Sequence, residues 1–184
     1  LWDFPAKGAI TSRPVVSNGT LYFGSLDKRI YALDTKNAGK KIVDFQGDDW
    51  IWADLVTDGD LLYAGTLSGT VYGLNLLTLE EEWQELAKVP GRVVAAPVVA
   101  GDKVGVFSDE GYAVFFEVDD GYEYWTKSYG GKEELSFRSS PISFQDGKFV
   151  AVMKSNCSVA ILQITPANPS PREFDWLEDV DFCE

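Results

Sequence analysis

The strongest constraint on this chain is an internal repeat. The stretch LYFGSLDKRIYALD, residues 21–34, returns in altered form as LYAGTLSGTVYGLN, residues 62–75, which begins 41 residues later. Each copy holds two apolar runs joined by a short polar turn, a pattern typical of two antiparallel strands. A self-match at a period of about 40 residues predicts a repeat architecture, in which each unit buries its apolar face against the next one.

Four segments open with a small or polar residue, continue with an apolar pair beside a turn, and then lead into such a strand pair. They are SRPVVSNG (12–19), WADLVTDG (52–59), AAPVVAGD (95–102) and SSPISFQDG (139–147). We expect about four short strands in each unit, with Gly, Asp and Asn at the reversals, where a positive φ is tolerated. Residues 75–88 have some helical spacing, but their register in the repeat predicts a turn and a strand.

An apolar residue also recurs between the units, as Trp2, Val43, Trp83 and Trp125, at spacings of 40 to 42 residues. We expect Trp2, Trp83 and Trp125 to lie on outer strands and to dock between neighbouring sheets, because a buried indole removes about 150–250 Å² of surface from water. Small sheets with an apolar face are stable when they stack around an axis. The sequence therefore predicts an all-β fold, a β-propeller of about four four-stranded antiparallel blades.

The string SxPVVxxGxLYFGSxDxxxYALD, followed by a Trp before the next copy, resembles the PQQ-like β-propeller repeat of quinoprotein alcohol dehydrogenases. It also resembles the propeller of the outer-membrane assembly lipoprotein and of many bacterial secreted or lipid-anchored proteins. The resemblance covers residues 1 to about 165. Members of this family commonly close with seven or eight blades. Four copies therefore leave three alternatives: part of a larger propeller, half of an eight-bladed ring made by two chains, or a small ring closed alone. We favour the first two.

Residues 166–184, PANPSPREFDWLEDVDFCE, differ from the repeats and are predicted to form a Pro-rich acidic tail after a repeat domain at residues 1–165. Three prolines in six residues favour an extended connector. In one interpretation Phe174, Trp176, Leu177 and Phe182 pack back onto the last blade or cover its edge. In the other, the tail is a short motif that docks on a partner or on another copy.

Composition excludes several classes of function. The chain has 29 acidic and 16 basic residues, a net charge of −13, so its surface repels nucleic-acid backbones and anionic lipid headgroups. It lacks an apolar run of the roughly 20 residues that a membrane-spanning helix needs, so we expect no direct membrane insertion. The two cysteines, Cys157 and Cys183, either form a disulfide or are two unrelated thiols.

The sequence offers no catalytic constellation. His is absent, which excludes Ser/His/Asp and Cys/His arrangements. Adjacent acidic pairs such as Asp48 with Asp49 fall at predicted turns, and the DxDxDG spacing of a calcium loop is missing. The family resemblance would call for adjacent cysteines at a quinone site, and the chain has none. We therefore expect no cofactor, no metal and no enzymatic activity.

The most distinctive local feature is DDWIWADL, residues 48–55, where Trp50 and Trp52 point to the same side of an extended segment. They either fill the space between blades near the axis or form an aromatic rim that stacks on a sugar or grips a peptide.

Taken with the resemblance, these features predict a non-catalytic scaffold that binds another protein, or a second copy of itself, in a bacterial extracytoplasmic or membrane-anchored setting. Part of a PQQ-dependent dehydrogenase-like enzyme and a small-ligand sensor are the alternatives.

Overall fold

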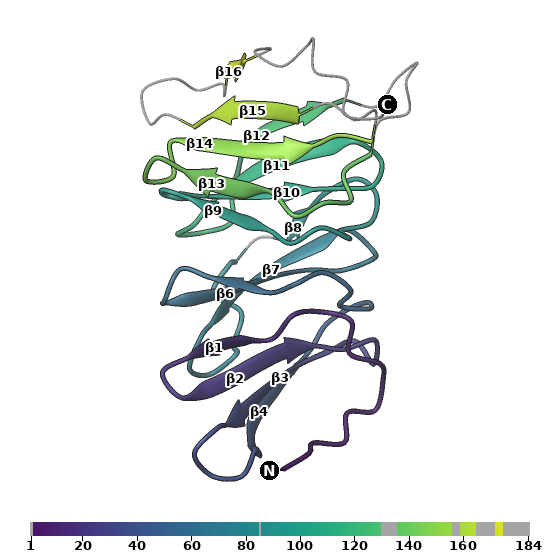
Figure 1. Cartoon of the computed structure of the whole chain (residues 1–184), viewed down its shortest axis with the longest axis vertical. Coiled ribbons are helices and arrows are strands. Elements are labelled where there is room, and N and C mark those ends of the chain that lie inside the picture. Colours follow the sequence, from purple (N-terminus) through teal and green to yellow (C-terminus); the bar gives the residue numbers. More distant parts are fainter. Residues whose placement is uncertain (1, 85, 130–135, 156–158, 165–171, 175–184) are drawn as a thin grey trace.

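The computed structural model describes residues 2–84, 86–129, 136–155, 159–164 and 172–174, and these form four sheets of four antiparallel strands each. The sheets follow one another along the long axis in chain order, and sheets 1 and 4 lie at opposite ends (Figure 1). Sheet 1 consists of β1 (Val15–Ser17), β2 (Thr20–Gly24), β3 (Arg29–Asp34) and β4 (Lys40–Gln46). Sheet 2 consists of β5 (Val56–Thr57), β6 (Leu61–Gly65), β7 (Thr70–Asn75) and β8 (Ala87–Lys88). Sheet 3 consists of β9 (Val98–Ala100), β10 (Lys103–Phe107), β11 (Tyr112–Glu117) and β12 (Glu123–Ser128). Sheet 4 consists of β13 (Ile142–Phe144), β14 (Phe149–Met153), β15 (Val159–Gln163) and β16 (Arg172–Phe174).

Residues at equivalent positions of the sequence repeat pair in the same register in all four sheets. In the central strand pair of each sheet, the equivalent partners are Tyr22 with Ala32, Tyr63 with Gly73, Gly105 with Phe115, and Ala151 with Ile161. The strand alternation then puts one face of sheets 2 and 3 toward the following sheet and the other toward the preceding one. This prediction of an all-β fold with four antiparallel blades is confirmed.

The turns that close these hairpins need glycine where another backbone approaches. Gly69, in the turn between β6 and β7, has a φ of +85°, and a Cβ there would lie 2.2 Å from the carbonyl oxygen of Val89. Only glycine tolerates both the left-handed conformation and this contact. The turn can therefore lie close to the segment that leaves sheet 2.

Three apolar cores fill the spaces between successive sheets. Tyr22 and Ile30 of sheet 1 pack with Leu62 and Leu74 of sheet 2, and the next two spaces are filled in the same way. A fourth, smaller cluster lies on the other face of sheet 1, where Phe4 packs against it. The sheets do not close into a ring, so the chain forms a partial propeller.

The predicted tail contributes one described element. β16 pairs with β15 in antiparallel register and completes sheet 4. Trp176, Leu177, Phe182 and both cysteines lie outside the described residues, so the tail boundary and the state of the cysteines stay predictions. The described part of the chain holds no helix long and apolar enough to cross a membrane.

Candidate functional site

Each connection between sheets is anchored by the same backbone hydrogen bond. The residue that makes it is Ile51, Val93 or Phe137, and its side chain is fully buried. We call these three the junction residues. Their N–H groups donate to the carbonyl oxygens of Ser25, Thr66 and Ser108 at 3.3, 3.1 and 3.1 Å. Each acceptor begins the central hairpin turn of the preceding sheet, so every junction is held in the same place relative to its sheet.

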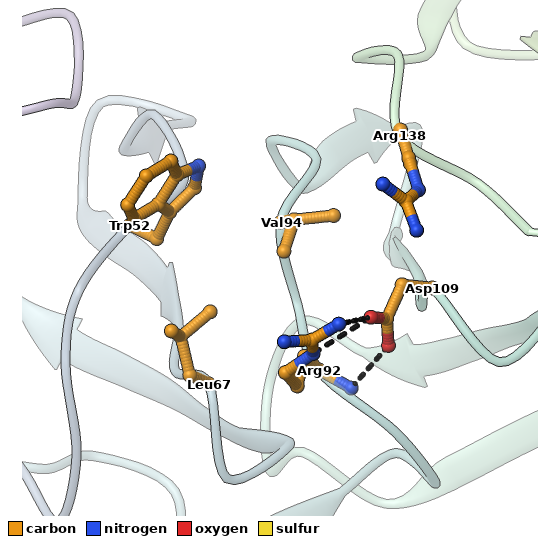
Figure 2. A pocket seen from close by; sticks show the side chains of 6 residues that line it. All are labelled: Trp52, Leu67, Arg92, Val94, Asp109 and Arg138. Atoms are coloured by element: carbon orange, nitrogen blue, oxygen red, sulfur yellow. Dashed lines mark hydrogen bonds and ion pairs between the residues drawn. The ribbon is translucent and has the colours of Figure 1, made fainter.

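The residues that follow the junction residues converge on one pocket. Trp52, Val94 and Arg138 occupy this equivalent position at three successive junctions. Together with turn residues and one further connection residue they line a pocket of about 290 Å³ (Figure 2). The remaining lining residues are Leu67, Arg92 and Asp109. Leu67 and Asp109 lie in the central turns of sheets 2 and 3, so the pocket belongs to the edge formed by turns and connections.

One wall of the pocket is ionic. The carboxylate of Asp109 accepts hydrogen bonds from the backbone N–H of Arg92 at 2.8 Å and from its Nε at 2.7 Å, and it lies 2.6 Å from a terminal guanidinium nitrogen. The Asp109 side chain is nearly buried, whereas that of Arg92 is exposed. Arg138 extends from its loop toward the same space (Figure 2). Two guanidinium groups therefore accompany a single carboxylate in this wall.

The other wall is apolar, because Trp52 and Leu67 stand opposite the ionic pair, with Val94 between them (Figure 2). A pocket with one apolar wall and an excess of guanidinium fits a ligand that carries an apolar group beside a carboxylate or carbonyl acceptor.

The two tryptophans of the DDWIWADL run point outward. Trp50 is 46% exposed and Trp52 is 43% exposed, whereas Ile51 between them is fully buried. The alternation of an extended segment explains this, because inserting Ile51 against Gly24 turns both neighbours away from the core. This exposure does not match the interpretation that the pair fills the space between blades. Trp52 lines the pocket, and Trp50 does not.

The neighbouring Asp48 ties this connection to sheet 2. Its carboxylate accepts hydrogen bonds from the hydroxyls of Ser68 and Thr70, both at 2.6 Å. Burial raises the pKa of Asp48, but the hydrogen bonds from Ser68 and Thr70 lower it more, so the net pKa lies below its ordinary value. Asp48 thus anchors the connection to sheet 2 and does not act together with Asp49 as a pair of carboxylates. The Asp49 carboxylate instead forms an ion pair with Lys28, with 3.2 Å between Oδ1 and Nζ.

The three tryptophans predicted to dock between blades differ in burial. Trp83 is 6% exposed, and its ring lies between Tyr63 of sheet 2 and Phe116 of sheet 3, at centroid distances of 5.6 and 5.9 Å. Trp125 is half-buried against Phe115, at 5.8 Å. Trp2 is exposed, and the position of its ring leaves no room for a Cβ on Gly39.

Sequence reasoning did not single out most of the pocket. Only Trp52 was a candidate; Arg92, Asp109 and their neighbours were not. The repeat register carries the missing signal, because Trp52, Val94 and Arg138 are equivalent positions whose residue types differ. No group of three or more Cys, Asp or Glu residues in the described ranges is placed to hold a metal ion.

Four repeated antiparallel sheets, stacked through equivalent junctions, define the class of protein as a β-propeller repeat protein. The family profile of the outer membrane protein assembly factor BamB matches residues 47–168, more than half of the chain. The chain belongs to this family.

Solved structures with the same fold include BamB from Moraxella catarrhalis, with a TM-score of 0.74 and 19% identity. The match covers 91% of this chain and 54% of that one. The computationally designed Ika8 protein matches with a TM-score of 0.71 and 17% identity, over 86% of this chain and 47% of that one. The designed Ika4 protein matches with a TM-score of 0.67 and 16% identity, over 88% of this chain and 94% of that one. A search of curated proteins finds no match. The chain thus spans about half the length of BamB and of Ika8.

Proposed function

We propose that this chain is a non-catalytic scaffold that binds another protein through the pocket at its turn-and-connection edge. The observation that carries the proposal is the convergence of Trp52, Val94 and Arg138 from three successive junctions on one pocket. A rigid stack of sheets holds these side chains in fixed positions, which is the property that a binding surface needs.

The chemistry of the pocket favours a peptide segment as the ligand. An exposed indole and an arginine are the side chains most enriched at the energetic centres of protein interfaces. Trp52 and Leu67 supply an apolar seat for one side chain, and Arg138 supplies a charged donor for an adjacent carboxylate. The net charge of −13 repels acidic partners in general, so an acidic residue is accepted only where this local guanidinium excess lies.

The family match supports a place for this binding outside the cytoplasm. The family is described as an outer membrane protein assembly factor. We infer from it a bacterial cell-envelope setting, periplasmic or lipid-anchored in the full-length protein. Immunofluorescence or fractionation of the tagged chain in its native cell tests this, and recovery in the cytoplasmic fraction alone contradicts it.

A displayed library of random peptides, selected on the folded chain, tests the binding proposal. We expect enriched peptides that carry a large apolar residue next to Asp or Glu. Trp52→Ala and Arg138→Glu should each weaken these peptides at least tenfold in a titration. Trp50→Ala is the matched control, since this neighbouring tryptophan is equally exposed but lies outside the pocket. Equal binding by Trp52→Ala and the control would refute the assignment.

A second copy of the chain is a further partner that we propose. The open stack of sheets supports self-association, because a closed propeller has no terminal sheets and covers the faces of all its blades. Two chains of four sheets would then form one ring of eight.

A further inference from the structure

The last sheet presents exposed apolar side chains on one face. In sheets 1 to 3 the face toward the following sheet is buried in an inter-sheet core. On the equivalent face of sheet 4, Ile142 pairs with Ala151, and Met153 lies two residues farther along β14. Ile142 is 64% exposed and Met153 is 56% exposed. The described part of the chain therefore leaves these two apolar side chains open to solvent.

The junction residues show what normally covers one position on such a face. Ile51 lies so close to Gly24 that a Cβ on this glycine would be 2.3 Å from Cγ2 of the isoleucine. Phe137 packs on Phe107 with 5.3 Å between the ring centroids. Gly24 and Phe107 hold the same register position in sheets 1 and 3, and both are buried. Met153 is the equivalent residue of sheet 4, so it marks the place of a fourth junction residue.

The register of β16 indicates where that residue lies in the sequence. Phe174 of β16 pairs with Ile161, and Val43 of β4 pairs with Ala32. Ile161 and Ala32 are equivalent residues of their sheets. Phe174 is therefore the equivalent of Val43, and the last strand of sheet 4 has the register of the last strand of sheet 1.

From these two residues onward the sequences also match. Residues 43–51 read VDFQGDDWI, and residues 174–182 read FDWLEDVDF. Both segments begin and end with an apolar residue, and both have Asp at the second and sixth positions and an aromatic residue at the third. The last residue is the junction residue Ile51 in the first segment and Phe182 in the second. Because residues 175–184 lie outside the described residues, this match is one of sequence and chain length.

We propose that Phe182 is a fourth junction residue, which packs on Met153 and covers this part of the exposed face of sheet 4. Two large side chains fit at this position, since Phe137 and Phe107 occupy it together in sheet 3. An aromatic ring beside a thioether is also a favourable contact. Residues 175–184 then continue the fourth repeat unit and do not form a separate tail.

Chain length favours this segment of the same chain over a second copy as the occupant. Pairing with Ile161 holds Phe174 in the sheet, and Phe182 follows it by the same number of residues by which Ile51 follows Val43. A segment tethered this closely has an effective concentration of about millimolar at its site. The proposal does not depend on the pocket or on self-association.

Thiol labelling of the full chain tests the proposal. Met153→Cys, combined with Cys157→Ser and Cys183→Ser, leaves one thiol, which lies under the proposed contact. We expect Phe182→Ala in this background to raise the rate of reaction with N-ethylmaleimide at least tenfold, because a covered thiol is less accessible to the reagent. Circular dichroism melts confirm that each variant is folded.

Asp181→Ala is the matched control and should leave the rate unchanged. Position 181 is the equivalent of Trp50, whose exposed side chain points away from the core. Phe182→Leu should keep the slow rate, because the aliphatic Ile51 serves as a junction residue in sheet 1. Equal rates with and without Phe182→Ala overturn the proposal. A rate that falls as the protein concentration rises also overturns it, because the face would then belong to a second copy.

Discussion

Replacing Trp83 with Ala should destabilise the fold more than the same substitution at any other tryptophan that the structure describes. The indole is 6% exposed and fills the space between sheets 2 and 3. At about 25 cal/mol per Å² and about 150–250 Å² for a buried indole, the transfer contribution is about 4–6 kcal/mol, an upper estimate since the unfolded chain already hides part of this surface. Core Trp to Ala substitutions cost about 3–5 kcal/mol in practice. We expect a loss of about 4 kcal/mol in the free energy of unfolding.

The hydrogen bond of the indole can be measured separately. Nε1 of Trp83 donates to the carbonyl oxygen of Val118 at 2.8 Å, across the space between the two sheets. Trp83→Phe keeps an aromatic ring but removes this donor, so it should cost about 1–2 kcal/mol for the bond plus a smaller packing loss. The difference between Trp83→Ala and Trp83→Phe then reports the packing contribution of the ring.

Urea unfolding followed by circular dichroism is the assay, with thermal melts beside it. For a chain of this length, about 4 kcal/mol corresponds to a decrease of about 8–16 °C in melting temperature. Trp52→Ala removes the same side chain from an exposed site and should change stability by about 0.5–1 kcal/mol at most. A Trp83→Ala variant that loses no more stability than Trp52→Ala would refute the packing role of Trp83.

Two further predictions concern the same region of the fold. Gly73→Ala should cost about 1–3 kcal/mol in urea unfolding, because its Cβ would lie 2.6 Å from the indole of Trp83, and should cost much less in a Trp83→Ala background. The free energy of unfolding should also decrease below about pH 4. Folding lowers the pKa of Asp48, because the hydrogen bonds to its carboxylate outweigh the effect of burial. The stabilisation from Asp48 is therefore complete above its unfolded pKa of about 3.9 and is lost as the pH falls through its folded pKa. Melting temperatures between pH 7 and pH 3 check this, and Asp48→Asn should reduce the slope below pH 4; an unchanged slope contradicts it.

The repeat and the alternation of apolar residues were enough to predict the sheets. Partners such as Tyr22 with Ala32 and Tyr63 with Gly73 follow from a period-two pattern and a turn, both of which are local. The same register predicted that a turn and a short strand, and not a helix, follow residue 75, and the structure has β8 there.

The pocket could not be predicted in the same way. Its position depends on how far apart successive sheets lie and how they are rotated, which no local pattern encodes. The alternation of an extended segment predicted that Trp50 and Trp52 lie on the same side, but it did not predict whether that side faces the core or the solvent. That was decided by Ile51, whose insertion against Gly24 is a contact between segments 27 residues apart. Arg92 and Asp109 likewise meet across 17 residues of sequence.

The position of the pocket links it to the ends of the stack. In a linear repeat each sheet is stabilised only by its neighbours, and among the described residues sheet 4 packs on one neighbouring sheet, so it is the least supported sheet that contributes to the pocket. Arg138 stands on the connection into this sheet, just after Phe137, which packs on Phe107 of sheet 3. Loosening of sheet 4 would therefore displace Arg138 while leaving Trp52 in place. The proposed self-association at the open end of the stack would oppose this loosening, so peptide binding and self-association should reinforce each other.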